Sequence, residues 1–145
     1  MKLTCQQSEL NAALSLVGGA IAPRPTHPVI ANVLLDANQL TGTTQLTGFD
    51  LSLGMSASIP VEVEDGGKIT LPARLLSDII SLLPEGELVL EINDEFGATI
   101  TCSSGKYQVQ GMTADQYPAL PEISDGEAFE LDSEAMLSGL KNTLF

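Results

Sequence analysis

The chain has 145 residues, and its 6 Lys and Arg against 19 Asp and Glu give a formal net charge of −13. This length is typical of one domain, or of one domain plus a fragment, and it can bury a core without disulfides or metals. The charge argues against a general electrostatic binder of nucleic acid, because neutralising phosphates requires Lys and Arg. The sequence also contains no apolar run of the ~18 residues that a membrane span needs.

The first half of the chain has the pattern of a strand, a helix and three further strands. Residues 1–6 predict the first strand, and we expect Ser8 to cap the helix that follows. The helix has its apolar residues at the i, i+3, i+4, i+7 spacing of one buried face: Leu10, Ala13, Leu14 and Val17. Gly18 and Gly19 are expected to end it. After a proline-rich loop, the alternation of residues predicts three strands: 29–35, 40–47 and 51–59.

The second half repeats this order. A strand is predicted over 68–71, and Pro72 suits the first turn of a helix. The predicted helix has an apolar stripe of Leu75, Leu76, Ile79, Ile80 and Leu83. Three strands follow, over residues 87–92, 98–102 and 106–110. The chain therefore predicts an α+β fold of two βαβββ halves, 1–60 and 67–112, with the two helices packed together against the sheets.

The composition changes after the second half. Prolines and acidic residues mark 112–126 as a linker, and a new strand is predicted over 129–131. Asp132 or Ser133 would cap a third helix, whose apolar residues are Met136, Leu137, Leu140 and Leu144. We expect the first domain to cover residues 1–120. Residues 121–145 are expected to be a linker and the opening strand and helix of a truncated second domain.

Each of the first two helices has a polar face opposite its apolar stripe. The faces consist of Ser8, Asn11, Ala12 and Ser15 in the first helix, and of Arg74, Ser77, Asp78 and Ser81 in the second. Short polar residues let a large, smooth partner lie close to a helix without being held tightly. An ordinary solvent-exposed face is the alternative interpretation.

No catalytic or metal-binding pattern is found. His27 is the single histidine, and the sequence lacks the glycine-rich phosphate loops and the G-x-S-x-G nucleophile motif. Cys5 and Cys102 lack metal-binding spacing and are expected to be free thiols in a reducing compartment. Residues 12–22 resemble a secretion signal, but Glu9, Asn11 and the helical spacing favour a cytoplasmic protein. The sequence predicts a protein that is not an enzyme and needs no metal or cofactor.

Four motifs resemble one known family, the bacterial sliding clamps or DNA polymerase III beta subunits. Residues 24–30 (RPTHPVI) are similar to the family's R-P-T-x-P-[IV] loop, and residues 46–53 (LTGFDLSL) to its T-G-x-D-L-E turn. Residues 71–86 (LPARLLSDIISLLPEG) are similar to its P-A-R helix, and residues 116–120 (QYPAL) to its D-[FY]-P-x-L motif. The four motifs occur in the family's order, and the resemblance covers essentially the whole chain.

The resemblance implies the DNA clamp fold, in agreement with the repeat of βαβββ halves. It implies a full-length protein of three such domains, two copies of which join head to tail as a homodimeric ring around double-stranded DNA. The helices would line the hole and meet DNA independently of its sequence. Such a processivity factor is not a catalyst: it tethers the replicative DNA polymerase, and a clamp loader opens it. Polymerase and loader would bind mainly to later domains.

The resemblance also implies roles for particular residues. Arg24 and Arg74 correspond to basic residues that contact DNA. The strand at 106–110, with Lys106, Tyr107 and Val109, corresponds to the edge strand that pairs with the last domain of the partner subunit, and we expect Tyr107 and Val109 to be exposed on that edge; an interior strand of a monomer is the alternative. The first helix has no Lys or Arg, and Leu75 stands where a lysine follows the arginine in relatives. A competing hypothesis is a β-rich module that binds peptides or proteins through its sheet edge and never meets DNA.

Overall fold

The computed structural model describes residues 1–21, 25, 27–121 and 126–144. Its helices are α1 (Gln7–Val17), α2 (Ala73–Leu82) and α3 (Ser133–Thr143). Its strands are β1 (Lys2–Gln6), β2 (Asn32–Asn38), β3 (Thr43–Phe49), β4 (Gly54–Pro60), β5 (Glu62–Asp65), β6 (Gly67–Pro72), β7 (Glu87–Ile92), β8 (Gly97–Cys102) and β9 (Gly105–Gln110). Short 3-10 segments occur at Gly18–Ala20, Pro28–Ala31 and Ala114–Gln116.

The strands form two antiparallel sheets. The five-stranded sheet has the order β5-β1-β7-β8-β9, and the four-stranded sheet has the order β4-β3-β2-β6. The strand–helix–three-strand order that the sequence predicts is therefore present twice, as β1-α1-β2-β3-β4 and β6-α2-β7-β8-β9. The predicted α+β fold is confirmed, and β5 is an additional strand that the sequence did not predict.

The two halves exchange their first strands. β1 begins the first half but pairs with β7 of the second half, from Lys2 opposite Glu91 to Gln6 opposite Glu87. β6 begins the second half but pairs with β2 of the first half, from Asn32 opposite Pro72 to Ala37 opposite Gly67. Each sheet thus needs residues from both halves, and neither half can complete its sheet alone.

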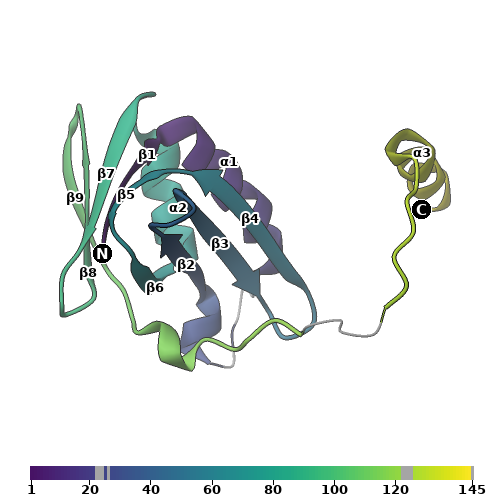
Figure 1. The fold of residues 1–145 in the computed structure, drawn as a ribbon, viewed down its shortest axis with the longest axis horizontal. Coiled ribbons are helices and arrows are strands. Elements are labelled where there is room, and N and C mark those ends of the chain that lie inside the picture. Colours follow the sequence, from purple (N-terminus) through teal and green to yellow (C-terminus); the bar gives the residue numbers. More distant parts are fainter. Residues whose placement is uncertain (22–24, 26, 122–125, 145) are drawn as a thin grey trace.

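The core lies between the sheets and helices α1 and α2. Figure 1 shows both helices on the same face of the four-stranded sheet, with α1 beside β4. α1 buries Leu10, Ala13, Leu14 and Val17, and α2 buries Ala73, Leu76 and Ile80, all in one cluster with side chains from both sheets. Fully burying one such leucine stabilises a fold by roughly 1.5–3 kcal/mol. The apolar spacing of α1 is confirmed residue by residue.

The start of α1 differs from the sequence prediction. The helix begins at Gln7 after Gln6, and no side chain caps it, so the prediction that Ser8 is the cap is wrong. Contacts from the other half take its place: the backbone N–H of Gln7 donates to the carbonyl of Gly86 at 2.8 Å. The start of α1 is therefore fixed by the chain that follows α2 rather than by its own sequence.

Other boundaries also shift, for local reasons. β2 starts at Asn32 rather than at 29, because Pro28 opens a 3-10 segment. β4 starts at Gly54 rather than at 51, because the carboxylate of Asp50 accepts the N–H groups of Ser52 and Leu53 and holds a turn. In α2, Leu76 and Ile80 of the predicted stripe are buried, but Leu75 is 49% exposed.

The tail contains one helix. The carboxylate of Asp132 caps α3 by accepting a hydrogen bond from the N–H of Ala135 at 2.8 Å. Asp132 is one of the two residues that the sequence predicts as the cap. None of the residues of α3 is buried. The predicted strand at 129–131 is wrong, because these residues have no strand partner and Phe129 is 79% exposed.

Candidate nucleic-acid interface

α1 and α2 lie side by side and run in opposite directions. Gln7 at the start of α1 contacts Ile80 near the end of α2, while Gly18 after α1 and Ala73 at the start of α2 line the same hollow. The outward face of α1 consists of short, uncharged side chains: Ser8, Ala12 and Ser15 are exposed. The outward face of α2 exposes Arg74, Asp78 and Ser81.

Arg74 is the only basic residue of these two helices. It lies in the first turn of α2, exposed, and among the described residues it forms no salt bridge. No side chain caps this end of α2, so the partial positive charge of the helix N-terminus adds to the charge of the guanidinium group. The arrangement can hold one phosphate near Arg74 without base contacts.

Arg74 also borders an open hollow of about 430 Å³ between the end of α1 and the start of α2. Its lining includes Gly18, Ile21 and Pro25 on one side and Ser77 and Asp78 on the other. Pro25, a residue of the proline-rich loop, therefore lies at the Arg74 end of the helix pair. Arg24, the other predicted DNA contact, lies outside the described residues.

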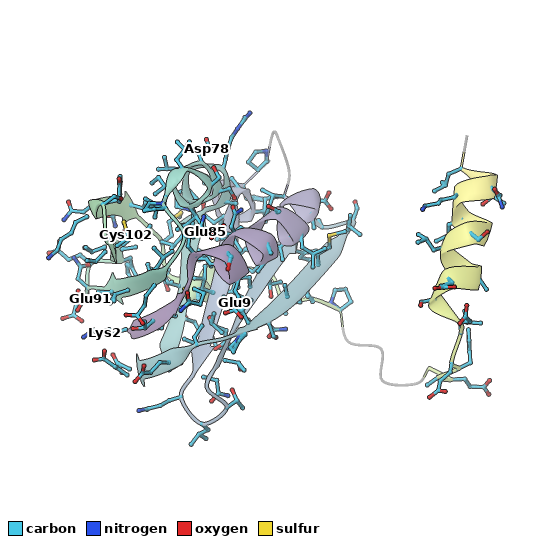
Figure 2. All side chains as sticks on the ribbon, turned by 90° about the horizontal axis from the view of Figure 1, so that it is seen from above. Lys2, Glu9, Asp78, Glu85, Glu91 and Cys102 are labelled. Atoms are coloured by element: carbon cyan, nitrogen blue, oxygen red, sulfur yellow. The ribbon has the colours of Figure 1, made fainter. Side chains whose placement is uncertain are left out.

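Acidic side chains lie around the helix pair, and one of them, Asp78, lines the hollow that Arg74 borders. Figure 2 shows Glu9, Asp78 and Glu85 around α1 and α2. Glu85 follows the C-terminus of α2, where the helix dipole is negative, and Glu9 lies in the first turn of α1. Phosphate attraction is therefore concentrated at the Arg74 end of the pair.

Two other lysines are paired on the sheets. Lys2 lies 2.9 Å from Glu64 and 3.8 Å from Glu91, which raises the pKa of Lys2, chiefly through the hydrogen bond with Glu64. Lys68 lies 2.7 Å from Asp36. These cations stabilise contacts between strands, so among the described residues Arg74 is the basic group of the helix face.

β9 lies at one edge of the five-stranded sheet, where β8 is its one strand neighbour among the described residues, and β5 lies at the other edge. Lys106 is exposed and Tyr107 is 36% exposed, whereas Val109 is 3% exposed and belongs to the core. The prediction that Val109 is exposed on the edge is wrong: its side chain lies opposite Ala98 of β8 and packs inward. The side chain of Val109 is therefore not available to a partner strand.

The described residues contain no cluster of three or more His, Cys, Asp or Glu positioned to hold a metal. His27 is exposed beside Pro28. Burial raises the pKa of Cys5 to about 12, so its thiol stays protonated. The hydroxyl of Ser104, 3.1 Å from Cys102, lowers the pKa of that thiol. In the part of the chain described by the structure, no helix is long and apolar enough to cross a membrane.

Comparison with known proteins agrees with this geometry. The family model described as "DNA polymerase III beta subunit, N-terminal domain" matches residues 1–121. The whole chain is 51% identical to the beta sliding clamp of Synechococcus elongatus and 45% identical to that of Synechocystis sp.. It spans 39% of the length of each of these two relatives.

Solved structures give the same result for the fold. The DNA polymerase III subunit beta of Pseudomonas aeruginosa superposes with a TM-score of 0.88 at 27% identity, over 98% of this chain and 38% of that one. The DNA polymerase sliding clamp of Bacillus subtilis gives 0.82 at 27% identity, over 88% of this chain and 35% of that one. The shared fold includes both sheets and the helix pair that carries Arg74.

Proposed function

Because this chain belongs to the DNA polymerase III beta subunit family, we propose that it is the N-terminal part of a sliding clamp. The clamp encircles double-stranded DNA and tethers the bacterial replicative polymerase, without being a catalyst itself. The family match over residues 1–121 is the observation that carries this proposal. The exposed, cation-poor helix pair is the face that we assign to the DNA.

The assigned DNA contacts are Arg24 and Arg74. The support for Arg74 is its exposure, its lack of a salt bridge among the described residues and its place in the first turn of α2. Arg24 rests on the motif resemblance and on the proximity of its loop, through Pro25, to Arg74. An arginine can grip a phosphate with two parallel hydrogen bonds, and this contact does not depend on the base sequence.

The strong negative charge is compatible with this role. A ring that confines DNA does not need high affinity, because DNA escapes only when the ring opens. Few phosphate contacts leave the duplex free to slide, since each contact adds salt-sensitive affinity. The acidic remainder of the surface repels other nucleic acid.

We assign the subunit interface to β9. An unpaired edge strand is a template for pairing with another chain. In this proposal the backbone of β9 pairs with the last domain of the partner subunit in a head-to-tail homodimer. Lys106 and Tyr107 supply side-chain contacts, while the side chain of Val109 stays in the core.

We also propose that residues 1–120 are the first clamp domain and that residues 121–145 open the second. Two observations support the boundary: the family match ends at residue 121, and α3 buries none of its residues. The clamp loader and the polymerase would bind mainly to later domains, and the ring would work in the cytoplasm.

Processivity tests this function. The full-length protein, with clamp loader and ATP, should lengthen the DNA that the replicative polymerase makes per binding event on a primed circular template. An unchanged product length would overturn the proposal. In that case, binding of peptides at the edge of β9 would be the competing function to examine.

A further inference from the structure

The segment that leaves the first domain, residues 111–120, lies across one end of the four-stranded sheet. We call it the exit strap. Figure 1 shows it running beneath the sheet from the β6 side to the β4 side, so it spans the sheet from one edge strand to the other. Contacts hold the strap at three points along this path.

The first point is a two-residue bridge to β6. The N–H of Met112 donates to the carbonyl of Thr70 at 2.9 Å, and the N–H of Thr70 donates back to the carbonyl of Met112 at 3.1 Å. The hydroxyl of Thr70 also donates to that carbonyl and accepts from the side-chain amide of Asn32 on β2. At Gly111 a Cβ would lie 2.7 Å from the carbonyl oxygen of Thr70. Only glycine permits this close approach.

The second point is Tyr117. Its hydroxyl donates to the carbonyl oxygen of Thr47 on β3 at 3.1 Å, and its ring is 9% exposed. The ring packs in a small apolar cluster, separate from the main core, with Val29, Ile30 and Phe49. Burial raises the pKa of Tyr117, so the hydroxyl keeps the proton that it donates.

The third point is Leu120. It packs against the same cluster and lies over Gly54, the first residue of β4, where a Cβ would collide with Leu120 Cδ2. Gly54 therefore leaves open the space that the Leu120 side chain occupies, and the Cβ of any other residue would fill it. We call this space the seat of Leu120. Along the chain, this is the last of the three contacts between the strap and the four-stranded sheet.

We propose that the exit strap fixes the place and direction in which the chain leaves the first domain, with Gly54 and Leu120 as positioning residues. This inference rests on the proposed clamp. In a ring of linked domains, a fixed exit narrows the range of angles between the first domain and the next. Loosening the seat populates geometries in which the ring closes less well, so it opens more often and loses DNA sooner.

The test uses the full-length protein with four variants. Leu120→Ala removes the anchor, and Gly54→Val fills its seat while keeping a residue that strands favour. Leu120→Met conserves the apolar volume, and Ser58→Val makes the same kind of change at an exposed position of β4 that the strap contacts do not include. Three quantities are measured: hydrogen exchange of residues 112–121, the thermal midpoint, and the half-life of the protein on nicked circular DNA.

Leu120→Ala and Gly54→Val should accelerate exchange around Tyr117 several-fold and shorten the half-life on circular DNA several-fold, with little change in the thermal midpoint. Leu120→Met and Ser58→Val should match the unmodified protein. Unchanged exchange in Leu120→Ala would overturn the seat. Faster exchange with an unchanged half-life, or a half-life that falls only in step with the thermal midpoint, would overturn the positioning role. If the unmodified protein is not retained on circular DNA, the clamp itself fails, while the exchange measurement still decides whether the seat exists.

Discussion

The side-chain amide of Gln7 donates a 2.7 Å hydrogen bond to the carbonyl oxygen of Ile80. Gln7 is the first residue of α1 and is 6% exposed, and Ile80 lies in α2. The bond therefore joins the two helices that the two halves of the chain contribute. Together with the exchange of β1 and β6, it connects the helix pair across the two halves.

Replacing Gln7 with Ala should lower the free energy of unfolding by about 1–3 kcal/mol, because a buried amide bond is lost and its acceptor is left less satisfied. Urea denaturation of the chain measures this change. Gln6→Ala is the matched control, since Gln6 is exposed, and it should stay within about 0.5 kcal/mol of the unmodified chain. Equal losses for both variants would show that the Gln7 bond contributes nothing specific.

Acid should weaken the turn between β3 and β4. Hydrogen bonds from the N–H groups of Leu53 and Ser52 lower the pKa of Asp50 below its ordinary value of 3.8. A lowered folded-state pKa means that the ionised group stabilises the fold above the unfolded value and that this contribution is lost as pH falls through the folded value. The window is therefore below pH 3.8.

The matched variant is Asp50→Asn, whose amide oxygen accepts the same hydrogen bonds without titrating. Denaturation at neutral pH and below pH 3.8 measures both proteins. The unmodified chain should lose more stability on acidification than Asp50→Asn, because the other carboxylates titrate in both. Equal losses of stability in the two proteins on acidification would mean that ionised Asp50 does not stabilise the fold.

Arg74→Ala should weaken binding of the full-length protein to duplex DNA and reduce the slope of log affinity against log salt by about 0.9, the value for one phosphate contact. Stability should change by less than about 0.5 kcal/mol, because Arg74 is exposed. Lys68→Ala removes the same charge from the face of β6 away from the helices and serves as the control. An equal effect of Lys68→Ala would contradict a specific contact at Arg74.

Two residues on the same face of β9 should behave differently. Tyr107→Ala should weaken self-association of the full-length protein and leave the domain folded, since Tyr107 is 36% exposed. Val109→Ala should instead destabilise the domain by about 2 kcal/mol, because it removes buried apolar surface and leaves a cavity. Sedimentation and thermal unfolding separate the two effects. Loss of folding in Tyr107→Ala would assign that ring to the core.

The local sequence predicts the elements well where one face must be buried. The spacing of Leu10, Ala13, Leu14 and Val17 determined α1, and β7 is found at the predicted residues. Alternation also places Tyr107 and Val109 on one face of β9. It does not determine how far the core extends along that face, so the burial of Val109 was missed. Leu75 was assigned to the buried stripe of α2 for the same reason.

Contacts between segments that are distant in the chain could not be predicted from the sequence. The residues near Gln7 do not predict its hydrogen bonds to Gly86 and Ile80. The residues of β1 do not predict that it pairs with β7. The exit motif at 116–120 was recognised by resemblance, but its seat at Gly54 depends on a close approach that only coordinates reveal. The proposed DNA contact of Arg74 came from resemblance too, because spacing alone allowed an ordinary solvent-exposed face.

Confinement of DNA without tight binding is tested most directly by cutting the DNA. The full-length protein is loaded on circular plasmid, washed at high salt, and counted on the plasmid before and after a single restriction cut. Our account predicts retention through the wash and loss after the cut, because linear ends let a ring slide off. Loss during the wash, or equal retention before and after the cut, would contradict it.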